Sequence, residues 1–409
     1  PSSGRRRLLR ARSPPAGRGR RVLVVAATAV ALLGTALAGV YGPWRDGSDP
    51  GATTDDPPGP VCDRTIAFLG PLGDPSLQRL AVQMRDGAAF AVARYNEADP
   101  GCQIKLVEYD SEDHREGAAR AARRIVDDTR TVGVVGPLFT NEARNAGPIL
   151  EAAGLPFVSP SITTAALREL GWRHYFPLMA DEGMQARAGI VYLRSTLPAI
   201  TCFIVYDDSD YGLATSAAVR ASPGVTVAGE QRITTAQTRF ADTATAVVRS
   251  GAGAIFFGGF AGAGGPLLRQ LREAGFTGTF VGADGLLDDQ FAAAAGPAAA
   301  PAVVTGPRLP ATEATDNFVG RFEAKYGTKA EGYEGYAYDA ANILLTGLAA
   351  GVDTRPRMRD HIAGHEHGGV MFSRYRFAAS GAPDPADARV ARYAIVGGKL
   401  EYQGTAKIV

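Results

Sequence analysis

Apolar runs alternate regularly with polar breaks along this chain, most clearly over residues 132–167. An apolar run at 132–135 ends at a Gly-Pro pair, a helical pattern covers 141–153, and a second apolar run follows at 156–159. Short apolar runs bounded by Gly and Pro predict buried strands. Two such strands joined by one helix predict a right-handed crossover in a parallel sheet, with both strands ending at the same edge.

The same alternation covers most of the chain in two series. Apolar runs at 65–70 and 104–109 precede this stretch, each followed by a helical pattern, and a second series begins after residue 177. Its apolar runs lie at 202–206, 226–230, 254–257, 279–281 and 303–305. The pattern predicts an α/β protein with two lobes, each a doubly wound parallel sheet, and a cleft between them.

Hydroxyl side chains follow both strands of the central stretch. Thr140 comes after the first strand, and Ser161, Thr163 and Thr164 come after the second. Free backbone N–H groups at two helix N-termini would converge there with these hydroxyls, which suits a carboxylate or another small anion. For Thr140 or Thr163 taken alone, simple helix capping is the competing interpretation.

Composition allows two folded domains and argues against one class of partner. The chain has 409 residues and 45% hydrophobic content, with a net charge of +1. Residues 1–21 hold eight arginines and no acid, so the rest of the chain carries 35 basic against 42 acidic side chains, about −7. A mildly acidic body with no basic stripe argues against nucleic-acid binding.

Three cysteines are too few for a disulfide scaffold. Cys62 and Cys102 precede the first two predicted strands, at the same end of one sheet, so a Cys62–Cys102 disulfide is expected outside the cytosol. Three free cytosolic thiols are the alternative. Cys202, at the head of an apolar run, is expected to be a buried thiol.

The N-terminal region predicts a membrane anchor. Residues 22–40 are uncharged and as a helix would span roughly 28 Å, so we expect a single transmembrane helix or signal anchor. Residues 1–21 would be its basic cytoplasmic flank, with the body exported, and 41–60 a Gly/Pro/Asp linker. The alternative is a secreted protein cleaved near Ala38.

Several short motifs together resemble one known family. They are LGP at 69–71, Asp110, VGP at 135–137, SPSITTAAL at 159–167, DDSDYG at 207–212, the Gly-Gly at 258–259, LLRQLREAGF at 267–276, GADG at 282–285 and YAYDA at 336–340. Their number and order resemble the branched-chain amino-acid (leucine-type) substrate-binding proteins of ABC transporters, which have the type I periplasmic-binding fold. The resemblance covers nearly all of the chain after residue 65.

The resemblance implies a binding site between the lobes. The ligand carboxylate would meet Thr140 and Thr163 with the backbone of Ile162, and its ammonium would meet Asp284. Tyr211 and Phe260 would line the pocket from the second lobe. A zwitterion needs an anion-binding group and a carboxylate on opposite sides, and exclusion of water strengthens both contacts. A turn or N-cap role is the alternative for Asp284.

The resemblance also implies the domain limits and the function. Three hinges near 176–180, 304–307 and 372–375 would separate a first lobe (61–178 plus 307–372) from a second (179–306 plus 373–409). The expected function is capture of an amino acid or similar small zwitterion for an ABC permease, without a cofactor and without enzymatic activity. The alternative is the ligand-sensing part of a membrane receptor, resembling actinobacterial chains in which a serine/threonine kinase precedes the membrane.

Two other clusters of chemically capable residues have simpler interpretations. His361, His365 and His367 could suggest a metal, but glycines interrupt the segment, so we interpret them as a solvated surface cluster. The acidic run at 207–210 lacks the glycine and terminal glutamate of a calcium loop and is interpreted as a polar strand end. No metal site is therefore predicted, and no Ser-His-Asp or Cys-His spacing indicates catalysis.

Overall fold

The computed structural model describes residues 59–408 except 76, 113–115 and 298. Among the described residues, none of the helices has the length and apolar character that crossing a bilayer requires. The predicted basic flank, the span at 22–40 and the linker up to residue 58 lie outside the described residues.

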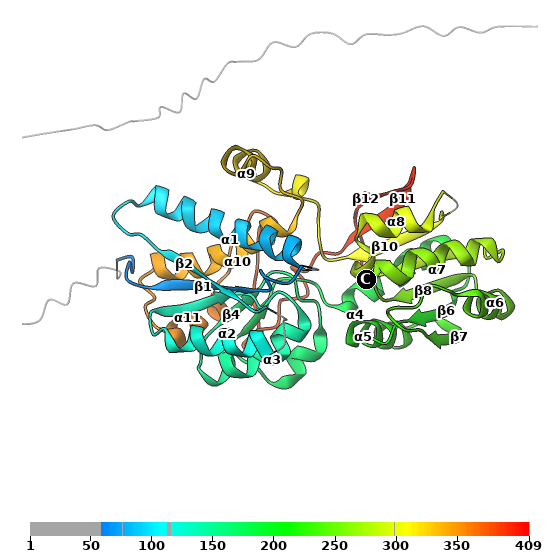
Figure 1. Cartoon of the computed structure of the whole chain (residues 1–409), viewed down its shortest axis with the longest axis horizontal. Coiled ribbons are helices and arrows are strands. Elements are labelled where there is room, and N and C mark those ends of the chain that lie inside the picture. Colours follow the sequence, from blue (N-terminus) through cyan, green and yellow to red (C-terminus); the bar gives the residue numbers. More distant parts are fainter. Residues whose placement is uncertain (1–58, 76, 113–115, 298, 409) are drawn as a thin grey trace, which may run out of the picture. The chain divides into compact units, whose positions relative to one another are not determined.

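The first lobe contains a five-stranded parallel sheet in the order β2-β1-β3-β4-β5 (Figure 1). Its strands are β1 (Thr65–Gly70), β2 (Lys105–Asp110), β3 (Thr131–Val135), β4 (Phe157–Ser159) and β5 (Tyr175–Pro177). All residues of β1 and β3 are buried, as expected for strands covered by helices on both faces. The predicted pairing of β3 with β4 through one helix is confirmed.

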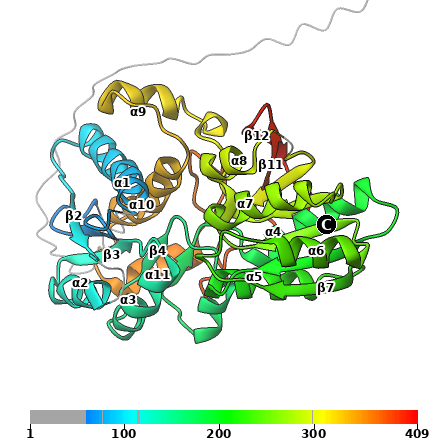
Figure 2. The ribbon, with the colours of Figure 1, turned by 45° about the vertical axis from the view of Figure 1, so that its right-hand side comes forward.

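Helices from distant parts of the chain form the rest of this lobe. They are α1 (Gln78–Ala98), α2 (Glu116–Asp127), α3 (Thr140–Ala152), the 3₁₀ helix η1 (Ala165–Leu170), α9 (Phe318–Tyr326), α10 (Tyr333–Ala349) and α11 (Arg355–Gly364). Helices α1 and α10 lie side by side in both ribbon views (Figures 1 and 2). A Cβ atom at Gly87 of α1 would lie 2.0 Å from the carbonyl oxygen of Glu334, so this close approach requires glycine.

The second lobe repeats the strand order of the first. Its parallel strands lie in the order β7-β6-β8-β9-β10, which corresponds position by position to β2-β1-β3-β4-β5. They are β6 (Thr201–Tyr206), β7 (Thr226–Arg232), β8 (Ala254–Gly258), β9 (Thr279–Gly282) and β10 (Ala302–Gly306). The helices of this lobe are α4 (Glu182–Thr196), α5 (Asp210–Arg220), α6 (Ala241–Ser250), α7 (Ala261–Glu273) and α8 (Asp289–Ala295), with the 3₁₀ helix η2 (Asp284–Leu286) after β9. The 3₁₀ helix η3 (Ala311–Glu313) contacts α9 and α10 of the first lobe.

The second sheet is not wholly parallel, which corrects the expectation from the sequence. Strands β11 (Ala391–Val396) and β12 (Lys399–Thr405) extend it antiparallel beyond β10. Gly397 and Gly398 join them with φ of 57° and 81°. Left-handed backbone at both central positions is what a two-residue hairpin turn requires, and glycine adopts it readily.

The chain passes between the two sheets three times. It leaves β5 for α4 through 178–181, leaves β10 for the helices over the first sheet after residue 306, and returns from α11 to β11 through 365–390. The third passage has no regular strand over residues 371–377, which include the hinge predicted near 372–375. Its described pairings are the isolated bridges of His367 with Tyr375 and Phe377 with Pro383.

The cysteines are arranged as the sequence indicated. Cys62 and Cys102 form a disulfide across a sequence separation of 40 residues. Cys202 is free and buried in β6, where burial raises the pKa of its thiol to about 12. A disulfide of this kind persists outside the reducing cytosol.

Candidate functional site

The predicted site residues lie where strands of the two sheets end. Thr140 follows β3, and Ser161, Ile162 and Thr163 follow β4. In the second lobe, Tyr211 follows β6, Phe260 follows β8 and Asp284 follows β9. In open α/β sheets ligands bind beyond the carboxyl ends of the strands, near the point where the strand order reverses. That point is β1/β3 in the first sheet and β6/β8 in the second.

Thr140 is the first residue of α3, and Phe139 takes the N-cap position. The Thr140 hydroxyl is 2.6 Å from the Thr164 hydroxyl, so these two side chains hydrogen-bond to each other across the two strand ends. The buried Glu142 side chain accepts the Leu138 N–H at 2.6 Å and so closes the turn before the helix. Thr140 therefore does not cap its helix through its side chain.

The residues after β4 form a tight, largely buried turn. Ser161 donates its hydroxyl to the Leu138 carbonyl at 2.6 Å, which ties this turn to the one before α3. The Ile162 N–H donates to the Ser159 hydroxyl at 3.2 Å. Thr163 is buried, and its hydroxyl points to the Glu182 carboxylate at 3.5 Å, the outer limit of a hydrogen bond. The predicted hydroxyls lie together, and each has a partner within the protein.

In the second lobe, Tyr211 and Asp284 are hydrogen-bonded, and the Phe260 ring lies beside the Tyr211 ring. The Tyr211 hydroxyl donates to Asp284 Oδ1 at 2.6 Å and accepts the Gly285 N–H at 2.9 Å. The rings of Tyr211 and Phe260 are 5.1 Å apart, and Phe260 is 47% exposed. The Phe260 ring therefore leaves an apolar surface beside Tyr211 open to solvent. Asp284 opens η2 and is not its N-cap, since Ala283 takes that position.

The first turn of α4 connects the two groups of site residues. Glu182 is 1% exposed and accepts the Ala165 N–H at 2.9 Å, in the turn after Thr163. One turn later, the Gln185 side-chain oxygen accepts the Asp284 N–H at 3.1 Å. Glu182 was not among the site residues predicted from the sequence. The signal was the pair Asp181-Glu182, an N-cap acid followed by an acid in the first turn.

Burial perturbs the acids of this region. Burial raises the pKa of Glu182 to about 7, the Ala165 N–H opposes that rise, and the negative charges of Asp284 and Asp181 add to it. Burial also raises the pKa of Asp284, while hydrogen bonds from Tyr211 and Gln185 and the charge of Arg308 act against it. Buried carboxyl groups with shifted pKa values and specific hydrogen-bond partners are typical of functional sites.

One ion pair joins the lobes outside this buried group. Arg144 of α3 lies 3.3 Å from Asp210, the first residue of α5. Both side chains are substantially exposed. The pair thus links helices of different lobes at the edge of the site.

Comparison with known proteins gives the family. A model of the periplasmic binding protein family matches residues 64–392, well over half of the chain. The chain belongs to this family.

Curated relatives of this periplasmic binding protein cover most of its folded part. It is 29% identical over 300 residues to an amino acid binding protein of Pseudomonas aeruginosa, covering 70% of this chain and 78% of that protein. It is 25% identical over 297 residues to a leucine-, isoleucine-, valine-, threonine- and alanine-binding protein of the same organism, covering 71% of this chain and 79% of the relative.

Solved structures show the same fold. A leucine-binding protein from Thermotoga maritima superimposes with a TM-score of 0.71 at 20% identity, covering 84% of this chain and 99% of the other. A branched-chain amino acid transporter substrate-binding protein from Streptococcus pneumoniae in complex with isoleucine gives a TM-score of 0.72 at 22% identity, with the same coverage. These likenesses establish the type I periplasmic-binding fold of the described lobes.

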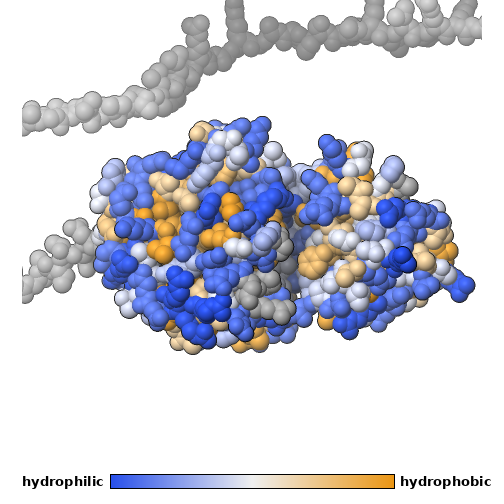
Figure 3. All heavy atoms as spheres, in the orientation of Figure 1, coloured by the Kyte–Doolittle hydropathy of each residue, from blue (hydrophilic) through white to orange (hydrophobic). Residues whose placement is uncertain are grey.

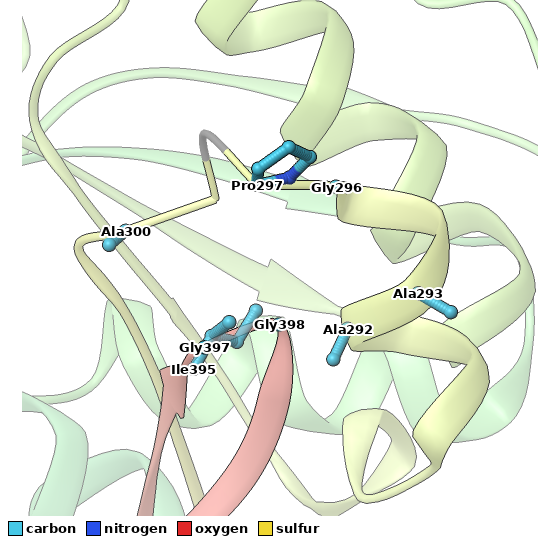
Figure 4. A pocket seen from close by; sticks show the side chains of 8 residues that line it. All are labelled: Ala292, Ala293, Gly296, Pro297, Ala300, Ile395, Gly397 and Gly398. Carbon is cyan, nitrogen blue, oxygen red and sulfur yellow. The ribbon is translucent and has the colours of Figure 1, made fainter.

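Two cavities of this binding protein lie away from the predicted residues. One of about 380 Å³ is lined by small residues of α8 and by the turn between β11 and β12 (Figure 4). The other, about 10 Å³, lies between segments 178–180 and 372–388. On the face drawn in Figure 3, polar residues are interspersed with smaller apolar areas. We therefore assign the candidate site from the hydrogen bonds and the strand-end positions of its residues, because neither of these two cavities is lined by them.

The histidine cluster differs in part from its interpretation. His361 lies 4.9 Å from His365 and 5.1 Å from His367 between ring centroids, but His367 is only 4% exposed. Calling all three solvated was therefore wrong, because the His367 ring bonds the Ile362 carbonyl and is covered. Burial, with the neighbouring histidines, lowers the pKa of His361 to about 4. Within the described part of the chain, no group of three or more ligating side chains is arranged to hold a metal.

The acidic run after β6 has a structural role. Asp207 is buried and accepts both the N–H and the hydroxyl of Ser209. Ser209 in turn accepts the Gly212 N–H as the N-cap of α5. This network positions Tyr211 at the start of the helix.

Proposed function

We propose that this protein captures a small amino-acid-like molecule between its two lobes and delivers it to an ABC permease. The observation that carries the proposal is that polar and aromatic side chains gather at strand ends of two sheets with the same order, and that the first turn of α4 connects them. Tyr211, Phe260 and Asp284 belong to the second lobe, and Thr140 and Thr163 belong to the first. Family membership and the names of the relatives, which are binding proteins, support a binding role without catalysis.

Thr140, Ser161, Ile162 and Thr163 would face the ligand from the first lobe. Asp284 would accept a hydrogen bond from the ligand ammonium, as charge-assisted bonds to a partly buried carboxylate are strong. The exposed Phe260 and the adjoining Tyr211 ring would cover its apolar part. Closure would take place at the three passages between the sheets, where a few residues can absorb the change in backbone angles.

A thermal-shift screen of the purified protein against amino acids and small amides tests this proposal. A ligand that binds only the folded state raises the melting temperature in a concentration-dependent manner. We expect at least one compound with an ammonium group to do so, and calorimetry should give one site per chain. A screen in which no such compound shifts the melting temperature would refute the proposal.

We also propose that the folded body lies outside the cytoplasm and is held at the membrane through residues 22–40. The Cys62–Cys102 disulfide and the family support export. The intact protein should remain with membranes after a high-salt wash. A mature N-terminus at Gly39 would instead identify a cleaved, secreted form. The reported relatives give the receptor alternative no support.

A further inference from the structure

Glu182, the first residue of α4, places its carboxylate beside Thr163, one of the residues predicted to bind the carboxylate of the ligand. Its carboxylate accepts the Ala165 N–H at 2.9 Å, and the Thr163 hydroxyl points to it at 3.5 Å. The Glu182 N–H also donates to the Thr163 carbonyl at 3.3 Å, so the start of α4 is fastened to this turn through backbone and side chain. Glu182 is nearly inaccessible to solvent, which leaves its carboxylate few other partners.

The other polar groups of this turn are also satisfied within the protein. The Thr140 hydroxyl bonds the Thr164 hydroxyl, Ser161 donates to a carbonyl, and the Ile162 N–H donates to Ser159. A ligand carboxylate would therefore have to displace several of these bonds. It would also approach the Glu182 carboxylate, and like charges in a poorly hydrated place repel strongly.

The fixed charges around the site favour a cation. Glu182 and Asp284 contribute two carboxylates, and the negative charge of Asp284 adds to the rise in the pKa of Glu182 that burial causes. Arg308 is the cation that acts on Asp284. Asp181 is neutralised by its ion pair with Arg168. Two carboxylates against one unpaired cation leave one negative charge when both acids are ionised.

We propose that the ligand carries a primary ammonium group and no free carboxylate, and that Glu182 determines this preference by taking the place of the ligand carboxylate. The inference rests on the proposed function, since it concerns the same interlobe site. It narrows the ligand class from amino acids in general to amines and amino-acid amides.

Matched ligands test the inference directly on the full-length protein. L-leucine, L-leucinamide and 3-methylbutylamine share one side chain and differ only in the carboxylate, which is free, amidated or absent. The corresponding compounds of valine and alanine extend the series to smaller side chains. Isothermal calorimetry at pH 7.5 should give at least tenfold tighter binding of the amide or amine than of the amino acid in at least one series.

Substitutions assign the preference to Glu182. Glu182→Gln keeps an acceptor for Ala165 but removes the charge, and should reduce the ratio of amino-acid to amide dissociation constants at least fivefold. Glu182→Asp keeps the charge and should stay within threefold of the wild-type ratio. Glu151→Gln is the matched control, because Glu151 accepts the N–H groups of Arg173 and His174 beyond the other end of α3. It should leave the ratio unchanged.

The outcomes separate this inference from the proposed function. Wild-type protein that binds the free amino acids as tightly as their amides overturns the inference and leaves the proposed function standing. An unchanged ratio in Glu182→Gln overturns the role of Glu182. If that variant does not fold, the wild-type series decides. Failure of every compound to bind overturns both proposals.

Discussion

The ion pair between Arg144 and Asp210 should favour closure of the two lobes by a small, measurable amount. Its atoms are 3.3 Å apart, which in water corresponds to about 1.3 kcal/mol of Coulomb energy. Physiological salt and the ordering of two exposed side chains reduce this to about 0.5–0.8 kcal/mol. The pair joins α3 to α5 across the lobes, so it contributes only when the lobes meet. Its loss should weaken ligand binding about two- to fourfold.

A double-mutant cycle measures this contribution. Arg144→Gln, Asp210→Asn and the double variant would be titrated with L-leucinamide by calorimetry in 0.02 M and 0.5 M NaCl. The coupling energy should be about 0.5 kcal/mol at low salt and should decline at high salt. Arg269→Gln is the control, because Arg269 pairs with Glu273 within the single helix α7. The reasoning is refuted if the coupling is below about 0.2 kcal/mol at low salt, or if the control weakens binding equally.

Three further predictions concern binding and stability. Asp284→Asn keeps an acceptor for the Tyr211 hydroxyl but removes the negative charge. In calorimetry, L-leucinamide should therefore bind about 10- to 100-fold more weakly, while the melting temperature stays nearly unchanged. Unaltered affinity would contradict the assignment of Asp284 to the ligand ammonium. The Cys62–Cys102 disulfide closes a loop with a sequence separation of 40 residues. Replacing both cysteines by serine should lower the free energy of unfolding, measured by urea titration, by about 4 kcal/mol. A loss below about 1 kcal/mol would contradict this estimate from loop closure. Burial raises the pKa of Asp339 to about 7, so the folded state keeps a proton that the unfolded chain releases near pH 4. Relative to the Asp339→Asn variant, the free energy of unfolding of the wild type should therefore fall by up to about 1.4 kcal/mol per pH unit between pH 5 and pH 7. An increase over this range would contradict the raised pKa of Asp339.

Elements with local signals were predictable from the sequence. Strands β1 and β3 are short, continuous apolar runs, because helices cover both faces of a parallel sheet. The Cys62–Cys102 disulfide was predictable because both residues precede strands that turned out to be neighbours, β1 and β2. These elements could be predicted because they depend on residues close in sequence, or on the rule that two strands joined by one helix lie parallel in the same sheet.

Features that depend on contacts between distant segments were not predictable. Strands β11 and β12 lie at the edge of the second sheet, and the burial of their residues alternates along each strand. They therefore lack the continuous apolar runs from which the other strands were predicted. Glu182 was not recognised from the sequence, because the Ala165 N–H group that it accepts and the Asp284 charge that acts on it come from distant parts of the chain. His367 became buried because the returning segment pairs it with Tyr375.

The repeated strand order has a consequence for how ligand preference can change. Under the proposed function, each half would carry its own share of the recognition chemistry at its strand ends, and the chain passes between the halves three times. Selectivity would then be modular, because substitutions in one half could alter which end of a solute is recognised without disturbing the core of the other. A chimaera that exchanges one half for that of a homologue should inherit the donor's preference for one end of the molecule.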